Sequence, residues 1–167
     1  MSTVLEAELL VHLDAQINSA RQLLKLVLAQ GSAIRERDTE AVIARLADIQ
    51  SEMVRRGALE QERTGLLQRA GAALGMPATS VTLERLCSLI TQSAATSAMQ
   101  RSAELRGLLG EIAREHGINR ALMRQELTFL SHLTRLIGQE PEPGYSPPNG
   151  ARSAPAPSAY RALDLQA

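Results

Sequence analysis

The distribution of proline divides this chain into two unequal parts. Six of the seven prolines lie between positions 141 and 157, and the residues before them contain only Pro77. Proline removes a backbone hydrogen-bond donor and clashes with the preceding helical turn, so a proline-rich stretch cannot form a helix. We therefore expect a helix-permissive body over residues 1–138 and a flexible tail over residues 139–167.

Apolar residues in the body recur at intervals of three and four, and they never alternate with period two over the length of a strand. This pattern predicts an all-α domain. The clearest run predicts a first helix over residues 3–36 with a coiled-coil-like face, here called the N-terminal seam. The seam consists of Leu10, Leu13, Ile17, Ala20, Leu24, Val27, Gly31 and Ile34.

Capping signals place a second helix directly after the first. Asp38 or Thr39 is a candidate N-cap for a helix over residues 40–74, and the short connection predicts an antiparallel hairpin. In the middle of this helix, charged residues occupy the positions that continue the spacing of three and four. We therefore expect the middle of its apolar face to be solvated or ion-paired. The charged residues are Arg56, Glu60 and Arg63. Glycine and proline mark the end of the helix, at Gly71, Gly75 and Pro77.

The second half of the body predicts one short helix and one long helix. Ser80 and Thr82 are candidate caps for a third helix, and a final long helix runs to about Ile137. Residues 91–101, rich in Ala, Ser and Thr, are either a break or a weak continuation of helix. The expected architecture is an elongated antiparallel bundle of three to four helices. The apolar residues expected on the third helix are Leu83, Leu86, Leu89 and Ile90.

Two polar residues, His116 and Asn119, fall on the apolar face of the final helix. Buried polar groups in such a face fix the register between helices at a cost in stability. Alternatively, the face is locally exposed near Gly117. The sequence favours neither interpretation.

Composition argues against several classes of function. The chain has three aromatic residues, and 18 basic residues are balanced by 18 acidic ones, so no stacking surface or positive field would attract nucleic acid. The N-terminus lacks the basic residues of a signal peptide. The longest apolar stretch, residues 23–29, is far shorter than the roughly 20 residues that span a bilayer. We expect a soluble, cytoplasmic protein that does not insert into membranes.

The sequence carries no pattern for metal binding or catalysis. Di-metal bundles place Glu three residues before His, whereas Leu9, Ala113 and Phe129 occupy those positions here. A single cysteine, Cys87, excludes a multi-cysteine zinc site and lies among leucines, as a small buried apolar residue would. No Gly-x-Ser-x-Gly turn is present. We therefore predict no enzymatic activity, no catalytic residues, no metal and no cofactor.

An apolar stripe closes the final helix just before the tail. It is wider than one facing helix needs, and two interpretations follow: the stripe packs against the first two helices, or it forms a groove for a partner helix. The stripe consists of Met123, Leu127, Leu130, Leu133, Leu136 and Ile137.

The far end of the tail again contains apolar residues. Tyr160, Leu163 and Leu165 would form one turn of an amphipathic helix that docks on a partner or back on the body. The alternative is that they are exposed terminal residues without a role.

Local patterns of leucine, asparagine and tyrosine occur in a fixed order over nearly the whole chain. They are Leu59-Glu-x-x-Arg63-x-x-Leu66-Leu67 with Ala-Leu-Gly75, Thr82-Leu83-x-x-Leu86, Asn119-x-x-Leu122 with Leu127-x-Phe129-Leu130, and Tyr145 with Asn149-Gly150 and the closing Leu163-Asp164-Leu165. In this order they resemble the FlgN family, flagellar type III export chaperones for hook-associated proteins. The spacing between Tyr145 and Gly150 is wider than is usual in that family.

The resemblance implies a mechanism without catalysis. A helical chaperone domain over residues 1–138 would bind a terminal segment of the hook-filament junction proteins in the cytosol and prevent their premature assembly. It would then deliver the client to the cytoplasmic domain of the export-gate membrane protein. The family's tyrosine beyond the last helix, implicated in that docking, corresponds to Tyr145.

One alternative comes from a different class of protein. The N-terminal seam is also typical of a coiled-coil structural or regulatory protein that pairs with itself through residues 10–34. That protein would form a stable dimer with the seam buried between two chains, and it would bind no client.

Overall fold

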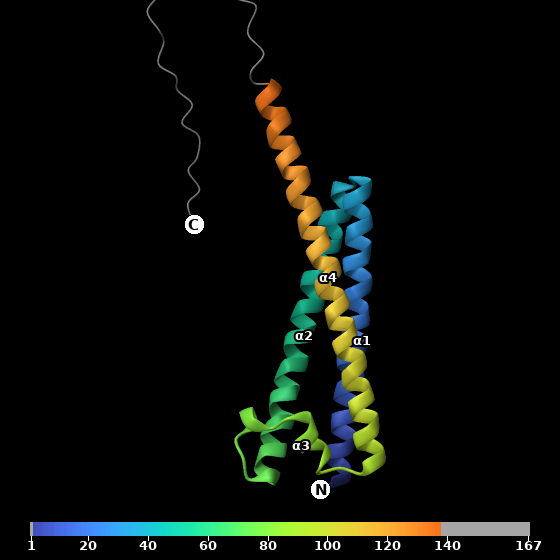
Figure 1. Cartoon of the computed structure of the whole chain (residues 1–167), viewed down its shortest axis with the longest axis vertical. Helices are drawn as coiled ribbons and strands as arrows, with labels where there is room; N and C mark the ends of the chain where they lie inside the picture. The colour runs from blue at the N-terminus through green and yellow to red at the C-terminus, as the bar shows by residue number, and fades with distance from the viewer. Residues whose placement is uncertain (1, 138–167) are drawn as a thin grey trace, which may run out of the picture.

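The computed structural model describes residues 2–137, which fold into four α-helices and one short 3-10 helix without any strand (Figure 1). The elements are α1 (Ser2–Glu36), α2 (Thr39–Leu74), η1 (Ala78–Ser80), α3 (Leu83–Cys87) and α4 (Gln92–Ile137). The three long helices give the molecule an elongated shape, and α2 runs opposite to α1 and α4. The predicted all-α, antiparallel bundle is confirmed.

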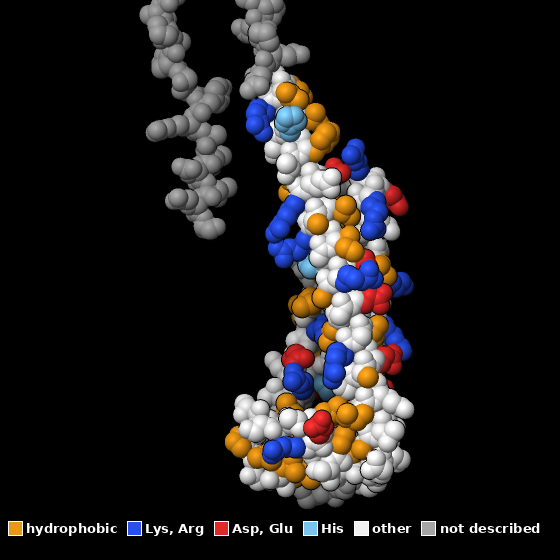
Figure 2. All heavy atoms as spheres, in the orientation of Figure 1, with side chains coloured by type: hydrophobic (Ala, Val, Ile, Leu, Met, Phe, Trp, Pro, Cys, Tyr) orange, Lys and Arg blue, Asp and Glu red, His pale blue; other side chains and the backbone are white. Residues whose placement is uncertain are grey.

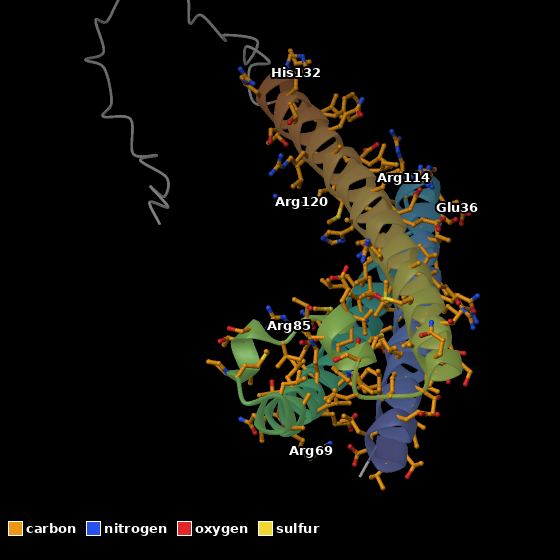
Figure 3. All side chains as sticks on the ribbon, turned by 60° about the horizontal axis from the view of Figure 1, so that its bottom comes forward. Glu36, Arg69, Arg85, Arg114, Arg120 and His132 are labelled. Atoms are coloured by element: carbon orange, nitrogen blue, oxygen red, sulfur yellow. The ribbon has the colours of Figure 1, made fainter. Side chains whose placement is uncertain are left out.

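Helix α1 is the central element of the fold. Helices α2 and α4 each pack along α1, whereas α2 and α4 make very little direct contact with each other. At the lower end in Figure 1, α3 lies between α2 and α4, as the turned view in Figure 3 also shows. The core cluster at this end consists of Leu9, Leu13, Leu66, Ala70, Leu86 and Ala98.

The N-terminal seam is buried inside the chain. Ile17, Ala20 and Val27 retain 4%, 0% and 1% of their exposure, because α2 and α4 cover this face of α1. A surface that the chain itself covers is not free to pair with a second copy. The prediction of self-association through residues 10–34 is therefore wrong.

The turn between α1 and α2 is fixed by backbone and side-chain hydrogen bonds. The Arg37 and Asp38 amides donate to the carbonyl oxygens of Ile34 and Ala33, at 3.1 and 3.0 Å, as in a Schellman helix end. Arg37 adopts the left-handed conformation at φ 58°. The Asp38 carboxylate then accepts from the Ala41 amide at 3.0 Å. Of the two predicted candidates, Asp38 is thus the N-cap of α2, and Thr39 is the first residue of the helix.

Helix α2 ends at Leu74 and is capped by Gly75, whose φ of 65° is adopted most readily by glycine. Gly71 lies inside α2 and not after it, which corrects the prediction that it ends the helix. A Cβ at Gly71 would lie 2.7 Å from the Met76 carbonyl oxygen. Glycine is required there because the chain folds back closely against the helix.

The third helix is shorter than predicted. Thr82 caps it by accepting from the Arg85 amide at 3.3 Å, but Leu89 and Ile90 lie beyond its end and still pack on the core cluster. Residues 92–101 belong to α4, which is one continuous helix of 46 residues. Its first turns bury small residues against the rest of the body: Ala94, Ala95 and Ala98.

Candidate functional site

A buried asparagine sets the register of α4 on α1. Asn119 is 2% exposed, and its Nδ2 donates to the Val27 carbonyl oxygen at 2.8 Å and to Gln30 Oε1 at 3.4 Å. Gly31 makes room for it, because a Cβ there would lie 2.7 Å from Asn119 Oδ1. His116 is exposed. Asn119 is thus a buried polar group that fixes the register between helices. His116 instead lies on a part of the helix face that is exposed.

This register leaves the end of α4 projecting past the α1–α2 turn (Figure 1). Arg37 at the turn is paired with Glu126, at 3.4 Å between Nη2 and Oε1, so the residues after Glu126 lie near or beyond the end of α1. Figure 2 shows apolar side chains on this projecting end. Arg120 and His132 also point away from α4 into solvent (Figure 3).

The apolar stripe is exposed among the described residues. Leu127, Leu130 and Ile137 keep 63%, 55% and 73% of their exposure. The interpretation in which the whole stripe packs against the first two helices is therefore wrong, because α4 is longer than the hairpin beside it. The stripe is an apolar face that the described residues leave largely exposed, and only its first part lies beside α1 and α2.

A groove, here called the upper groove, lies beside the stripe and encloses about 360 Å³. Its floor is Ile34 of α1, one wall is the start of α2, and the other wall is α4. Val42 and Ile34 were not predicted as site residues, although both lie on predicted apolar faces. The groove is lined by Ile34, Arg37, Thr39, Val42, Met123, Glu126, Leu127, Phe129 and Leu130.

A second hollow, here called the lower pocket, lies above α3 between α2 and α4 and encloses about 340 Å³. Figure 2 shows a depression at this place. Its lining is mainly leucine, and His12 and Arg56 each bring a buried nitrogen without a hydrogen-bond partner among the described residues. The sequence did not predict this pocket. The sequence feature that could have indicated this pocket is the run of charged residues at positions on the apolar face of α2.

Several predicted site residues lie outside the part of the chain that the structure describes. They are Tyr145, Tyr160, Leu163 and Leu165. Nothing in the packing of residues 2–137 tests their roles.

The lone cysteine packs with the core cluster. Cys87 is half-buried, and burial together with the nearby Glu84 carboxylate raises the pKa of its thiol above the ordinary value. Among residues 2–137, no group of three or more His, Cys, Asp or Glu side chains is placed to hold a metal ion.

None of the helices formed by the described residues is long and apolar enough to cross a membrane.

Comparison with known proteins gives one match. The family model described as FlgN protein matches residues 1–153, which include the whole described body and the position of Tyr145. No curated protein and no solved structure matches the chain. The family match covers most of the sequence, and it agrees with the order of leucine, asparagine and tyrosine patterns along the chain. The chain therefore belongs to the FlgN family of flagellar export chaperones.

Proposed function

We propose that this chain binds the terminal helical segment of hook-associated junction proteins in the cytoplasm, prevents their premature assembly and delivers them to the export gate. Family membership supports a flagellar export chaperone that binds flagellar substrate proteins. The observation that carries the finer proposal is the exposed apolar stripe on the projecting end of α4.

The stripe and the upper groove suit an amphipathic helix. Burying a leucine side chain is worth about 1.5–3 kcal/mol, so a helix covering several stripe residues gains substantial binding energy. A client segment that is unfolded when free loses about 2–5 kcal/mol of that gain in becoming ordered. The resulting affinity is moderate, which suits a chaperone that must release its client.

Delivery would use the segment that follows α4. Tyr145 lies eight positions after Ile137, the last residue of α4, and within the family match. Tyrosine offers a large contact area for little loss of side-chain entropy, so a single tyrosine is an effective anchor. In this proposal the stripe holds the client while Tyr145 contacts the cytoplasmic domain of the gate protein.

The test is a double substitution on the stripe, Leu130→Asp with Leu133→Asp. Both side chains are exposed, at 55% and 37%, so the variant should fold. Binding of a terminal segment from a hook-associated protein is measured by isothermal titration calorimetry. We expect affinity to fall at least about a hundredfold, since two buried leucines are lost and two carboxylates would be desolvated.

The matched control carries the same change on α2, Ile43→Asp with Val54→Asp. These residues are 63% and 78% exposed and line neither hollow. The control should bind like the unmodified chain. If the folded stripe variant also binds like the unmodified chain, the client site is elsewhere.

A further inference from the structure

The upper groove and the lower pocket lie on the same side of the molecule. Both have α1 as the floor and α2 and α4 as walls. Their lining residues are related by 18 positions, which is five helical turns, so each helix presents the same face to both hollows. The related pairs are Gln16 and Ile34 on α1, Val42 and Glu60 on α2, and Leu105 with Met123 and Leu109 with Leu127 on α4.

Eighteen residues of helix span about 27 Å at 1.5 Å per residue. A single straight helix of a partner can therefore reach both hollows while it lies along α4. Helices α2 and α4 hardly touch each other, although together they bury the face of α1 between the two hollows, where Ala20 and Val27 are 0% and 1% exposed. Between the two hollows, a partner helix would therefore lie over the junction of α2 and α4 and not on α1 itself.

The lower pocket is lined mainly by apolar side chains, with a few polar and charged side chains among them. Leu9, Leu66 and Leu86 form buried walls, and Leu105 and Leu109 of α4 lie at the side. A volume of about 340 Å³ is at the small end of ligand pockets and has room for one large side chain and a neighbouring polar group.

Arg56 lines this pocket together with two other charged residues, Glu60 and Arg63. Its Nη1 is buried and has no hydrogen-bond partner among the described residues. The carboxylates one turn away on either side, Glu52 and Glu60, each have other hydrogen-bond or ion-pair partners, although Glu60 lines the same pocket.

Glu52 accepts from Ser19 Oγ at 2.6 Å and lies 3.6 Å from Arg55. Glu60 is paired with Arg63 at 2.9 Å and accepts from Gln16 Nε2 at 3.4 Å. Arg56 is a half-buried residue that brings one buried guanidinium nitrogen, without a partner among the described residues, to the pocket. A carboxylate is the group that satisfies it best, since guanidinium and carboxylate match in charge and in bidentate geometry.

We propose that the lower pocket is the second end of the client site and that it takes one large apolar side chain and one carboxylate from the client helix. The carboxylate accepts from Arg56, and the apolar side chain packs on the leucines. This contact lies about five turns along the client from the residue that fills the upper groove. The inference rests on the proposed function, because it concerns the same client segment.

The test compares two neighbouring arginines of α2 in the full-length chain. Arg56→Gln removes one of the two arginine charges that line the pocket, whereas Arg55→Gln removes an exposed charge outside it. The probe is the terminal segment of a hook-associated protein, titrated calorimetrically. Arg56→Gln should weaken binding about tenfold or more, and Arg55→Gln should change it by less than about twofold. Circular dichroism melts check that both variants fold.

Replacing each Asp and Glu of the client in turn with its amide identifies the partner of Arg56. One replacement should weaken binding to the unmodified chain but not to the Arg56→Gln chain, as expected for a coupled pair. A photo-crosslinking residue at Ser102, which also lines the pocket, should then attach to the client. Crosslinks to residues 139–167 of the same chain, or to a second copy, would overturn the proposal.

The outcomes separate this inference from the proposed function. If Arg56→Gln binds like Arg55→Gln while the stripe variant has lost binding, the lower pocket is not part of the client site and the proposed function stands. If the segment does not bind the unmodified chain, or binds the stripe variant equally well, both proposals fail.

Discussion

The Nδ2 atom of Asn119 donates to the carbonyl oxygen of Val27 at 2.8 Å, one turn before Gly31 on the same face of α1. This bond joins residues that lie 92 positions apart in the chain. Because Gly31 has no side chain, the asparagine approaches the α1 backbone closely. The pair fixes how far α4 projects past the turn, and therefore how much of the apolar stripe is exposed.

Gly31→Ala should destabilise the fold by about 1–3 kcal/mol, because the new Cβ would lie 2.7 Å from Asn119 Oδ1. Asn119→Ala should cost a similar amount, since it leaves a cavity in a buried contact. The double variant should cost less than the sum, because removing the amide makes room for the methyl group. Urea unfolding followed by circular dichroism gives the three free energies of unfolding.

Gly110→Ala is the matched control for this cycle. It lies in α4 with nothing within 4 Å of the added Cβ, so it should stabilise the fold by about 0.5–1 kcal/mol. Additive losses in the Gly31 and Asn119 cycle would show that the two residues are not coupled.

Arg37→Gly should raise the melting temperature by a few degrees. Arg37 has a φ of 58°, which costs a non-glycine residue about 1–2 kcal/mol, whereas its ion pair with Glu126 is exposed and worth at most about 1 kcal/mol. Arg37→Ala loses the ion pair but keeps the backbone strain, so it should melt below the glycine variant. Equal melting temperatures for the two variants would argue against backbone strain.

Cys87 should react slowly with a thiol reagent such as DTNB while the chain is folded. Burial and Glu84 raise the pKa of its thiol, so less thiolate is present at pH 8 than in an unfolded chain. Unfolding in guanidinium should therefore speed the reaction, and absorbance gives the rate directly because the chain has one cysteine. Equal rates in the two states would contradict the burial of the thiol.

The raised pKa of the Cys87 thiol also makes the stability of the fold depend on pH. A thiol whose pKa is raised by folding stabilises the folded state below the unfolded-state value, and this contribution is lost as pH rises through the folded-state value.

Tyr145→Ala should leave client affinity unchanged and weaken binding to the cytoplasmic domain of the export-gate protein. Pull-down of the loaded chaperone by that domain measures the effect. Ser146→Ala is the control, because it changes the neighbouring position and leaves Tyr145 in place. If gate binding survives in the Tyr145 variant, the docking residue is a different one.

Much of the fold could be predicted because local chemistry decides it. Asp38 at the start of α2 and Gly75 at its end act through their own backbone and side chains, so the sequence places both among a few candidates for the helix ends. The start of α4 could not be identified in this way. The sequence around Ala94 and Ala98 favours neither a helix nor a break. These residues belong to a helix because they are buried against the rest of the body.

The candidate site was predicted only where it lies on one helix. The residues of the stripe share a helical face, and that face is visible in the spacing. The lower pocket needs four helices to be placed first, so Arg56 could not be distinguished from an ordinary solvated arginine. The spacing of the N-terminal seam predicts that another helix covers it. It does not show whether that helix is α4 of the same chain or belongs to a second copy.

The central position of α1 has a consequence for the order in which the protein is made. Val27 leaves the ribosome long before Asn119, and at about 5–20 residues per second the wait is about 5–18 seconds for a separation of 92 residues. During this interval the nascent α1–α2 hairpin exposes the face of α1 that α4 later covers. Translation speed therefore sets how long that face is open to other proteins in the cell.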